Sequence, residues 1–251
     1  MMKKEFGMFQ AVTGRLLAFE RVEGQGPGVV FLHGFKSDMG GTKAVDLQAW
    51  CSEQGRAMLR FDLSGHGQSG GAVEDFGVGD WLEDARELID ALAPGPQVLV
   101  GSSLGGWLAL LLARERPERW AGLVTIAAAP DFTLRMQGEF TEADRAALAR
   151  DGHVTRPSDY GEDYVFSERL FRQGAEHSVF ASRLALPMPV RFLQGTADAD
   201  VPMADALRLL DHAEGPDIRL TLVRGADHRF SAPAELALIR DAVAGICAAA
   251  G

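Results

Sequence analysis

The chain has 251 residues, of which 47% are hydrophobic and 24% charged, and its formal net charge is −10 at pH 7. This length and composition are typical of a soluble globular protein with one large domain and a closed core. The acidic excess disfavours nucleic acid as a partner. No segment approaches the 18 uninterrupted apolar residues of a transmembrane helix, so we expect no stable membrane insertion.

The N-terminal stretch and the cysteines indicate the compartment. Lys3 and Lys4 are followed by no apolar run like that of a signal peptide, so we expect a mature N-terminus and a cytoplasmic location. The two cysteines, Cys51 and Cys247, lie far apart in no metal-ligand spacing. We therefore expect free thiols in a reducing compartment, and neither a metal nor another cofactor.

The predicted elements alternate between apolar strands and amphipathic helices. An antiparallel pair is expected first, over 8–12 and 15–22, with its turn at Gly14. Apolar runs then predict strands at 28–32, 57–62, 97–100, 122–126, 190–193 and 218–223. Helices are predicted between them at 42–53, 79–92, 104–116, 203–213 and 234–249. This order predicts a doubly wound, mostly parallel eight-stranded sheet of the α/β class, in a single domain over residues 1–251.

One segment interrupts this alternation. Between the predicted strands at 122–126 and 190–193 the chain shows no sheet pattern, and insertions of this length in a compact domain are usually functional. Thr141 and Asp144 have the spacing of a capping box at the start of a helix. We predict that residues 131–186 form a helical cap insertion over an active site.

The run Gly101-Ser102-Ser103-Leu104-Gly105 matches the G-x-S-x-G pattern of a nucleophile elbow. A predicted strand precedes it and a predicted helix follows at once, which is the context that this sharp turn requires. Ser103 is the central serine and the predicted nucleophile, whereas Ser102 occupies the variable position. The alternative without chemistry is an ordinary helix N-cap.

A nucleophilic serine needs a base and an acid that follow it in the order Ser, Asp, His. Of the six histidines, only His228 follows the last predicted strand. Asp198 lies three residues beyond Gly195, in the turn that follows the predicted strand at 190–193, and is the predicted acid. Asp200 is an alternative close by, although it would also suit the N-cap of the next helix. Asp131, after an earlier strand, is the reserve candidate for the acid.

Two backbone N–H groups are expected to form an oxyanion hole. One belongs to Leu104, directly after the nucleophile, and the other to Phe35 in the loop after the first long strand. His33 is expected to hold this loop by hydrogen bonds. Apolar side chains are candidates for an acyl pocket, with plain core packing as the alternative for each: Phe35, Met39, Trp107, Phe132 and Leu134.

These motifs together resemble the α/β-hydrolase superfamily over nearly the whole chain. Residues 31–44, 95–107 and 227–229 are similar to the mitochondrial palmitoyl-protein thioesterase type. That type removes S-linked acyl groups from proteins and cleaves acyl glucuronides. The resemblance implies a triad of Ser103, Asp198 and His228 and substrates that are acyl esters or thioesters. The chain departs from that type in having the usual hydrolase His33 in its oxyanion loop and no evident transit peptide.

The sequence therefore predicts a carboxylesterase- or thioesterase-type serine hydrolase, which cleaves its substrate through an acyl-enzyme. The expected partner is a small-molecule or acylated substrate, and the expected state is a monomer or homodimer. A C–C bond hydrolase or an aminopeptidase on the same triad is an alternative, as is a non-catalytic ligand-binding relative. Epoxide hydrolases and haloalkane dehalogenases are disfavoured because they use an aspartate where this chain has Ser103.

Overall fold

The computed structural model describes residues 3–157 and 163–249 and is built around an eight-stranded sheet in the order β1-β2-β4-β3-β5-β6-β10-β12. β2 pairs antiparallel with β1 and β4, and the remaining neighbours are parallel. The predicted doubly wound, mostly parallel sheet is confirmed. The strands are β1 (Lys4–Gln10), β2 (Leu16–Val22), β3 (Gln25–Leu32), β4 (Arg56–Phe61), β5 (Gln97–Ser102), β6 (Trp120–Ile126), β10 (Val190–Gly195) and β12 (Ile218–Val223).

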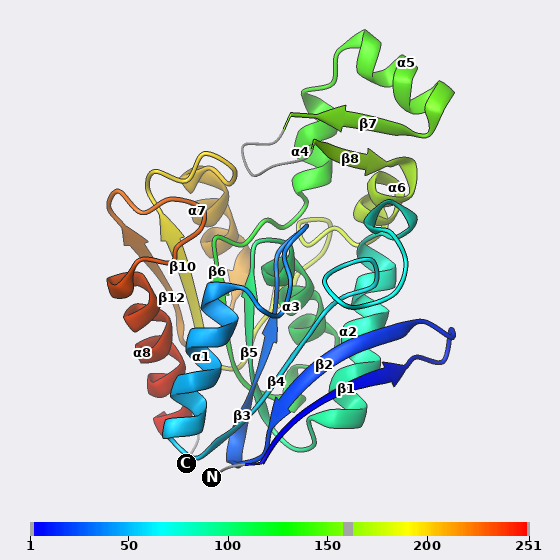
Figure 1. Ribbon diagram of the computed structural model, residues 1–251. Coiled ribbons are helices and arrows are strands. Elements are labelled where there is room, and N and C mark those ends of the chain that lie inside the picture. Colours follow the sequence, from blue (N-terminus) through cyan, green and yellow to red (C-terminus); the bar gives the residue numbers. More distant parts are fainter. Residues whose placement is uncertain (1–2, 158–162, 250–251) are drawn as a thin grey trace.

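Helices cover both faces of this sheet (Figure 1). One face carries α1 (Thr42–Glu53) and α8 (Pro233–Ala249), and the other carries α2 (Val78–Leu92), α3 (Leu104–Glu115) and α7 (Met203–His212). Short 3-10 helices lie at Val73–Asp75 and Pro117–Arg119.

The central strands are apolar without interruption because both of their faces are covered. In β5, Val98 and Val100 pack into the core beneath α1 and α8, whereas Leu99 between them packs into the core beneath α2 and α3. All three side chains have no exposed surface. Successive side chains of a strand point to opposite faces, so a strand between two helical layers needs an apolar residue at every position.

In the segment between β6 and β10, the part that carries α4 to α6 lies beyond the C-terminal ends of the parallel strands (Figure 1), and the chain then returns past α3 to the start of β10. It contains α4 (Phe132–Gly138), α5 (Glu142–Asp151), β7 (His153–Arg156), β8 (Tyr164–Ser167), α6 (Glu168–Glu176) and β9 (Leu184–Ala185), and β9 pairs with β11 (Ala213–Glu214). Residues 158–162 of the predicted cap lie outside the described residues, as do residues 1–2 and 250–251 of the predicted domain.

The segment predicted as a helical cap contains helices but also strands, which the sequence did not predict. β7 and β8 pair antiparallel, with Val154 opposite Phe166. Each of these strands has only four residues, which is too short for alternation to be distinguished from irregular structure. The helix expected at 141–150 is present as α5, and the Thr141 hydroxyl accepts a hydrogen bond from the Asp144 N–H.

Candidate active site

Ser103 occupies the sharp turn between β5 and α3. Its backbone has φ 54° and ψ −117°, a conformation that residues with a side chain rarely adopt. Neighbouring glycines make the turn possible, because a Cβ on Gly105 would lie 2.1 Å from the Leu32 carbonyl oxygen. The Ser103 N–H donates to the Ile126 carbonyl at 2.9 Å and so anchors the turn to β6. The serine hydroxyl is thereby held at the C-terminal edge of the sheet.

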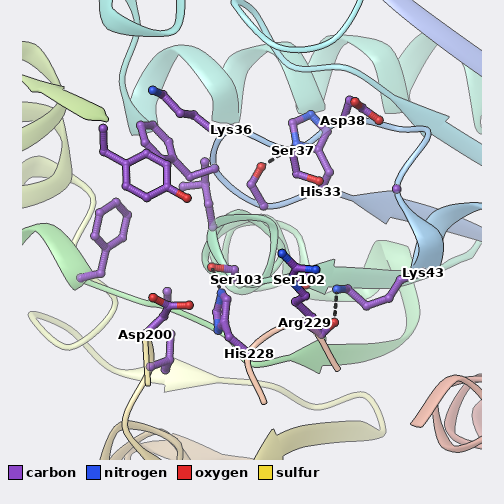
Figure 2. A pocket seen from close by; sticks show the side chains of 18 of the residues that line it. His33, Lys36, Ser37, Asp38, Lys43, Ser102, Ser103, Asp200, His228 and Arg229 are labelled. Atoms are coloured by element: carbon purple, nitrogen blue, oxygen red, sulfur yellow. Dashed lines mark hydrogen bonds between the residues drawn. The ribbon is translucent and has the colours of Figure 1, made fainter. Parts of the chain in front are cut away.

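Ser103, His228 and Asp198 form one hydrogen-bonded chain, although they come from three separate loops. His228, in the loop after β12, places Nε2 3.2 Å from Ser103 Oγ. Its Nδ1 lies 2.9 Å from Oδ2 of Asp198, which follows β10. The Asp198 side chain is fully buried, whereas that of His228 is 19% exposed. Figure 2 shows His228 beside Ser103 at the centre of the pocket.

The surroundings of Asp198 keep its carboxylate ionised. Burial by itself would raise the pKa of Asp198, but hydrogen bonds from His228, Val201 and Gln194 outweigh it and hold that pKa below its ordinary value. Because an ionised carboxylate only accepts hydrogen bonds, we assign the His228 proton to Nδ1. His228 Nε2 is then the acceptor that faces the Ser103 hydroxyl.

The reserve acid, Asp131, lies elsewhere. Its carboxylate accepts hydrogen bonds from the Ser178 hydroxyl and from the Val179 N–H at 2.7 Å, and so ties the start of α4 to the segment after α6. Asp200 donates its backbone N–H to Asp198 Oδ1 at 3.0 Å. The structure therefore brings Asp198, and not Asp131, to the histidine.

Within residues 3–157 and 163–249, one group of side chains has the spacing of metal ligands. It consists of Asp198, Asp200 and His228, whose ligand atoms lie within 4.8 Å of one another. Both Asp198 oxygens already accept hydrogen bonds, from His228 and Gln194 and from the Asp200 and Val201 N–H groups. Asp198 and His228 belong to the series of hydrogen bonds that leads to Ser103, and we assign no metal to this group.

The loop after β3 passes directly beside the serine. A Cβ on Gly34 would lie 3.4 Å from Ser103 Cβ, which places the backbone of this loop against the turn. His33 Nε2 accepts a hydrogen bond from the Leu63 N–H at 3.1 Å, so its Nδ1 donates to the Gly34 carbonyl at 2.8 Å. Burial lowers the pKa of His33 to about 4, so the ring is neutral. His33 thus holds the loop from the core side, as expected.

A cavity of about 660 Å³ opens over Ser103 and His228. Figure 2 shows Lys43, Arg229 and Ser102 on one side of the serine, and Lys36 and Asp200 on other sides. Lys43 Nζ donates to the Arg229 carbonyl at 2.5 Å, and burial lowers the pKa of Lys43. The apolar part of the lining includes Phe35, Leu104, Ala129, Phe132, Met136, Tyr164 and Phe166.

Not all of the predicted pocket residues face this cavity. Phe35 and Phe132 line it, but Met39, Trp107 and Leu134 do not. Trp107 is fully buried and donates its indole N–H to the His177 carbonyl at 3.1 Å. Met39 is also buried, and its N–H donates to Asp62 Oδ1 at 2.6 Å. The side chain of Leu134 instead faces solvent.

Other lining residues were missed by the sequence prediction. Tyr164 and Phe166 lie two positions apart on β8 and share one of its faces, but a strand of four residues is too short for this alternation to identify them from the sequence. Arg135, Arg156 and Lys43 also line the cavity, and no sequence motif singles them out.

Comparison with known proteins shows the family. The family model described as serine aminopeptidase, S33, matches residues 27–158, which is more than half of the chain. Mitochondrial palmitoyl-protein thioesterase ABHD10 of Rattus norvegicus is 36% identical over 225 residues, covering 89% of this chain and 76% of the relative. The chain belongs to the α/β-hydrolase family. It is a hydrolase of the esterase and thioesterase type, and the predicted resemblance and enzyme class are confirmed.

Solved structures agree over almost the whole chain. A putative hydrolase from Agrobacterium vitis superposes with a TM-score of 0.92 at 36% identity, covering 98% of this chain and 99% of the other. Mouse α/β-hydrolase domain-containing protein 10 gives a TM-score of 0.92 at 32% identity, covering 98% and 100%.

The cytoplasmic location expected from the sequence is wrong. The ABHD10 proteins of rat, cattle, mouse and human, all 34–36% identical to this chain, are named as mitochondrial proteins. In the described part of the chain no helix is long and apolar enough to cross a membrane.

Proposed function

We propose that this hydrolase cleaves acyl esters and acyl thioesters through an acyl-enzyme formed on Ser103. The observation that carries this proposal is the 3.2 Å contact between Ser103 Oγ and His228 Nε2. His228 is in turn held by the buried carboxylate of Asp198 at 2.9 Å. A serine becomes an effective nucleophile only when such an oriented base takes its proton.

The reaction proceeds in two halves. His228 Nε2 takes the Ser103 proton as Oγ attacks the acyl carbonyl, and the imidazolium then returns that proton to the departing alcohol or thiol. A water molecule, activated by the same nitrogen, next attacks the acyl-enzyme and releases the carboxylic acid. Asp198 remains ionised throughout, keeps the proton on Nδ1 and stabilises the imidazolium.

The negative charge on the carbonyl oxygen needs hydrogen-bond donors. We assign this role to the backbone N–H groups of Phe35, beside the serine, and of Leu104, at the N-terminus of α3. Each such donor is typically worth about 3 kcal/mol of barrier. The positive end of the α3 dipole adds to the same effect.

The apolar lining favours an acyl chain with substantial hydrocarbon. Phe35, Phe132, Tyr164 and Phe166 supply aromatic surface next to Ser103. The ABHD10 relatives are named palmitoyl-protein thioesterases, which supports acylated substrates for this chain too.

We also propose that residues 1–251 form a single domain, with residues 131–186 as its cap.

The test is hydrolysis of p-nitrophenyl esters from acetate to palmitate, together with one acyl thioester. Ser103→Ala is expected to lower kcat by roughly 10³-fold to 10⁶-fold. Ser102→Ala is the matched control, since it removes a neighbouring hydroxyl from the same elbow. Equal losses in both variants would contradict the assignment of Ser103. If the wild type cleaves none of these substrates, a C–C bond hydrolase, an aminopeptidase or a ligand-binding relative takes precedence.

A further inference from the structure

The Phe35 side chain lies where the sheet domain meets the segment between β6 and β10. Towards that segment, its ring stacks on Phe166 with centroids 5.5 Å apart and planes 15° apart. The Tyr164 ring lies 5.9 Å away and the Phe132 ring 6.5 Å away. Aromatic pairs at these separations attract one another and resist rotation. The residue to which we assign an oxyanion donor is therefore packed directly against β8.

The Phe35 ring also contacts residues of the sheet domain. Trp81 and His66 meet it edge-on, at 5.9 Å and 6.0 Å. Trp81 is fully buried in α2 and donates its indole N–H to the Ser64 carbonyl at 3.0 Å. The position of Phe35 is thus set both by Trp81 and His66 and by the side chains of β8.

The next residue, Lys36, is bound to β8 as well. Its φ of 52° lies in the left-handed region, where a residue other than glycine needs surrounding contacts to hold it. Those contacts come from the start of β8. Lys36 Nζ donates to the Asp163 carbonyl at 2.8 Å and lies 5.1 Å from the centre of the Tyr164 ring.

The loop beside Ser103 is consequently fixed from two directions. His33 holds its first half through the Gly34 carbonyl, and β8 holds its second half through Phe35 and Lys36. The direction of the Phe35 N–H depends on the backbone angles between these anchors. An oxyanion donor must be aimed within a few tenths of an ångström, so loss of one anchor misdirects it.

We propose that Tyr164 and Phe166 are positioning residues, which hold the Phe35 N–H in the oxyanion hole, so that the β7–β8 pair completes the catalytic centre. This inference rests on the proposed function and adds a second role to a segment that would otherwise only cover the site. It predicts that damage to β8 slows the chemical step even for a substrate too short to touch the aromatic wall.

The experiment uses p-nitrophenyl acetate with Phe166→Leu, Tyr164→Leu and the control Phe140→Leu. Phe140 belongs to the same segment and is as buried as Phe166, but it packs on Phe171 at 5.2 Å and does not line the cavity. The amplitude of the p-nitrophenol burst gives the fraction of active enzyme in each preparation. All rate constants are then expressed per active site, which removes the effect of partial misfolding.

The two β8 variants are expected to acylate about tenfold more slowly with little change in KM, whereas Phe140→Leu acylates at nearly the wild-type rate. A trifluoromethyl ketone, whose adduct carries the oxyanion, should lose affinity by the same factor, and the corresponding methyl ketone should not. Tyr164→Phe keeps the ring and should recover most of the rate.

Equal acylation rates per active site in the β8 variants and in Phe140→Leu would overturn this inference. So would a rise in KM with an unchanged acylation rate, because that pattern indicates contact with substrate alone. Both results leave the Ser103 mechanism standing. A burst that persists in Ser103→Ala would instead refute the proposed function itself.

Discussion

Ser103 Oγ and His228 Nε2 lie 3.2 Å apart, although 125 positions separate the two residues in the chain. The sheet makes this contact possible, because β5 and β12 both belong to its parallel part and end at the same edge. The elbow after β5 raises Ser103 towards the loop that carries His228. The geometry of the site thus follows from strand direction and from two loops at one edge.

Asp198→Asn tests the acid. An asparagine at this position donates its amide to Nδ1, which forces the histidine proton onto Nε2 and removes the acceptor that faces Ser103. We expect kcat for p-nitrophenyl butyrate to fall about 10⁴-fold. Asp131→Asn alters the buried reserve carboxylate and should lower the melting temperature, with kcat per active site within about threefold of wild type. Loss of activity in Asp131→Asn alone would contradict the assignment.

Two buried histidines make stability depend on pH. Burial lowers the pKa of His33 to about 4 and that of His66 to about 3, and their rings lie 4.9 Å apart. Between these values and 6.5 the unfolded chain binds more protons than the folded one. These two groups therefore do not reduce the free energy of unfolding above pH 6.5, and that free energy declines as the pH falls from 6.5 towards 4.

His66→Phe keeps a ring at this position but removes one titrating group. Urea unfolding at pH 7 and pH 4.5 should show that the variant loses less stability between these pH values than the wild type, by about 2 kcal/mol. The change in the free energy of unfolding between the two pH values is compared for each protein. Any packing cost of the substitution is the same at both pH values and therefore cancels. An identical pH dependence in both proteins would show that His66 is not held neutral by burial.

Gly105→Ala tests the close approach of the elbow to β3. The added Cβ would lie 2.1 Å from the Leu32 carbonyl oxygen, a backbone atom that cannot rotate away. We expect a loss of about 3–5 kcal/mol in the free energy of unfolding. Gly245→Ala in α8 meets no atom within 4 Å and should gain about 0.5–1 kcal/mol. Thermal melts that are unchanged by Gly105→Ala would contradict this packing.

An ion pair fastens α6 to α2. Arg169 Nε and Nη2 donate to the Asp80 carboxylate at 2.7 Å and 2.6 Å. Burial alone would raise the pKa of Asp80, but Arg169 and the Gly77 N–H outweigh it and lower that pKa. Because the Arg169 side chain is 44% exposed, a double-mutant cycle with Asp80→Asn and Arg169→Gln should give a coupling energy of only about 1 kcal/mol.

The matched comparison for that cycle is the exposed pair of Arg183 and Glu214, whose side chains are 72% and 54% exposed. Solvent screens this pair more strongly, so its coupling energy should be smaller. If the two pairs couple equally, partial burial of Asp80 adds nothing to the attachment of α6.

Much of the fold was predictable because buried strands and amphipathic helices leave local patterns. The helix expected at 42–53 and the strand expected at 218–223 occur with these bounds. The residues that the motifs grouped, Ser103, Asp198 and His228, are also brought together. Their chain order and their positions after successive strands were enough to place them at one edge.

The remaining features depend on contacts that no local pattern records. Trp107 was expected in the pocket, but α3 is buried from Leu104 to Ala113, so no polar face shows which side meets the cavity. The aromatic wall formed by Tyr164 and Phe166 depends on a strand pair of four residues each. Lys43 reaches the cavity only because α1 packs beside the loop that carries Arg229.

The most direct measurement is to trap the acyl-enzyme. The protein is mixed with p-nitrophenyl butyrate, quenched in acid within the burst phase, digested and analysed by peptide mass spectrometry. A butyryl group on Ser103 that is present in the wild type and absent in Ser103→Ala is the predicted result. A butyryl group on Ser102 or another residue, or turnover without any acylated peptide, would contradict the mechanism.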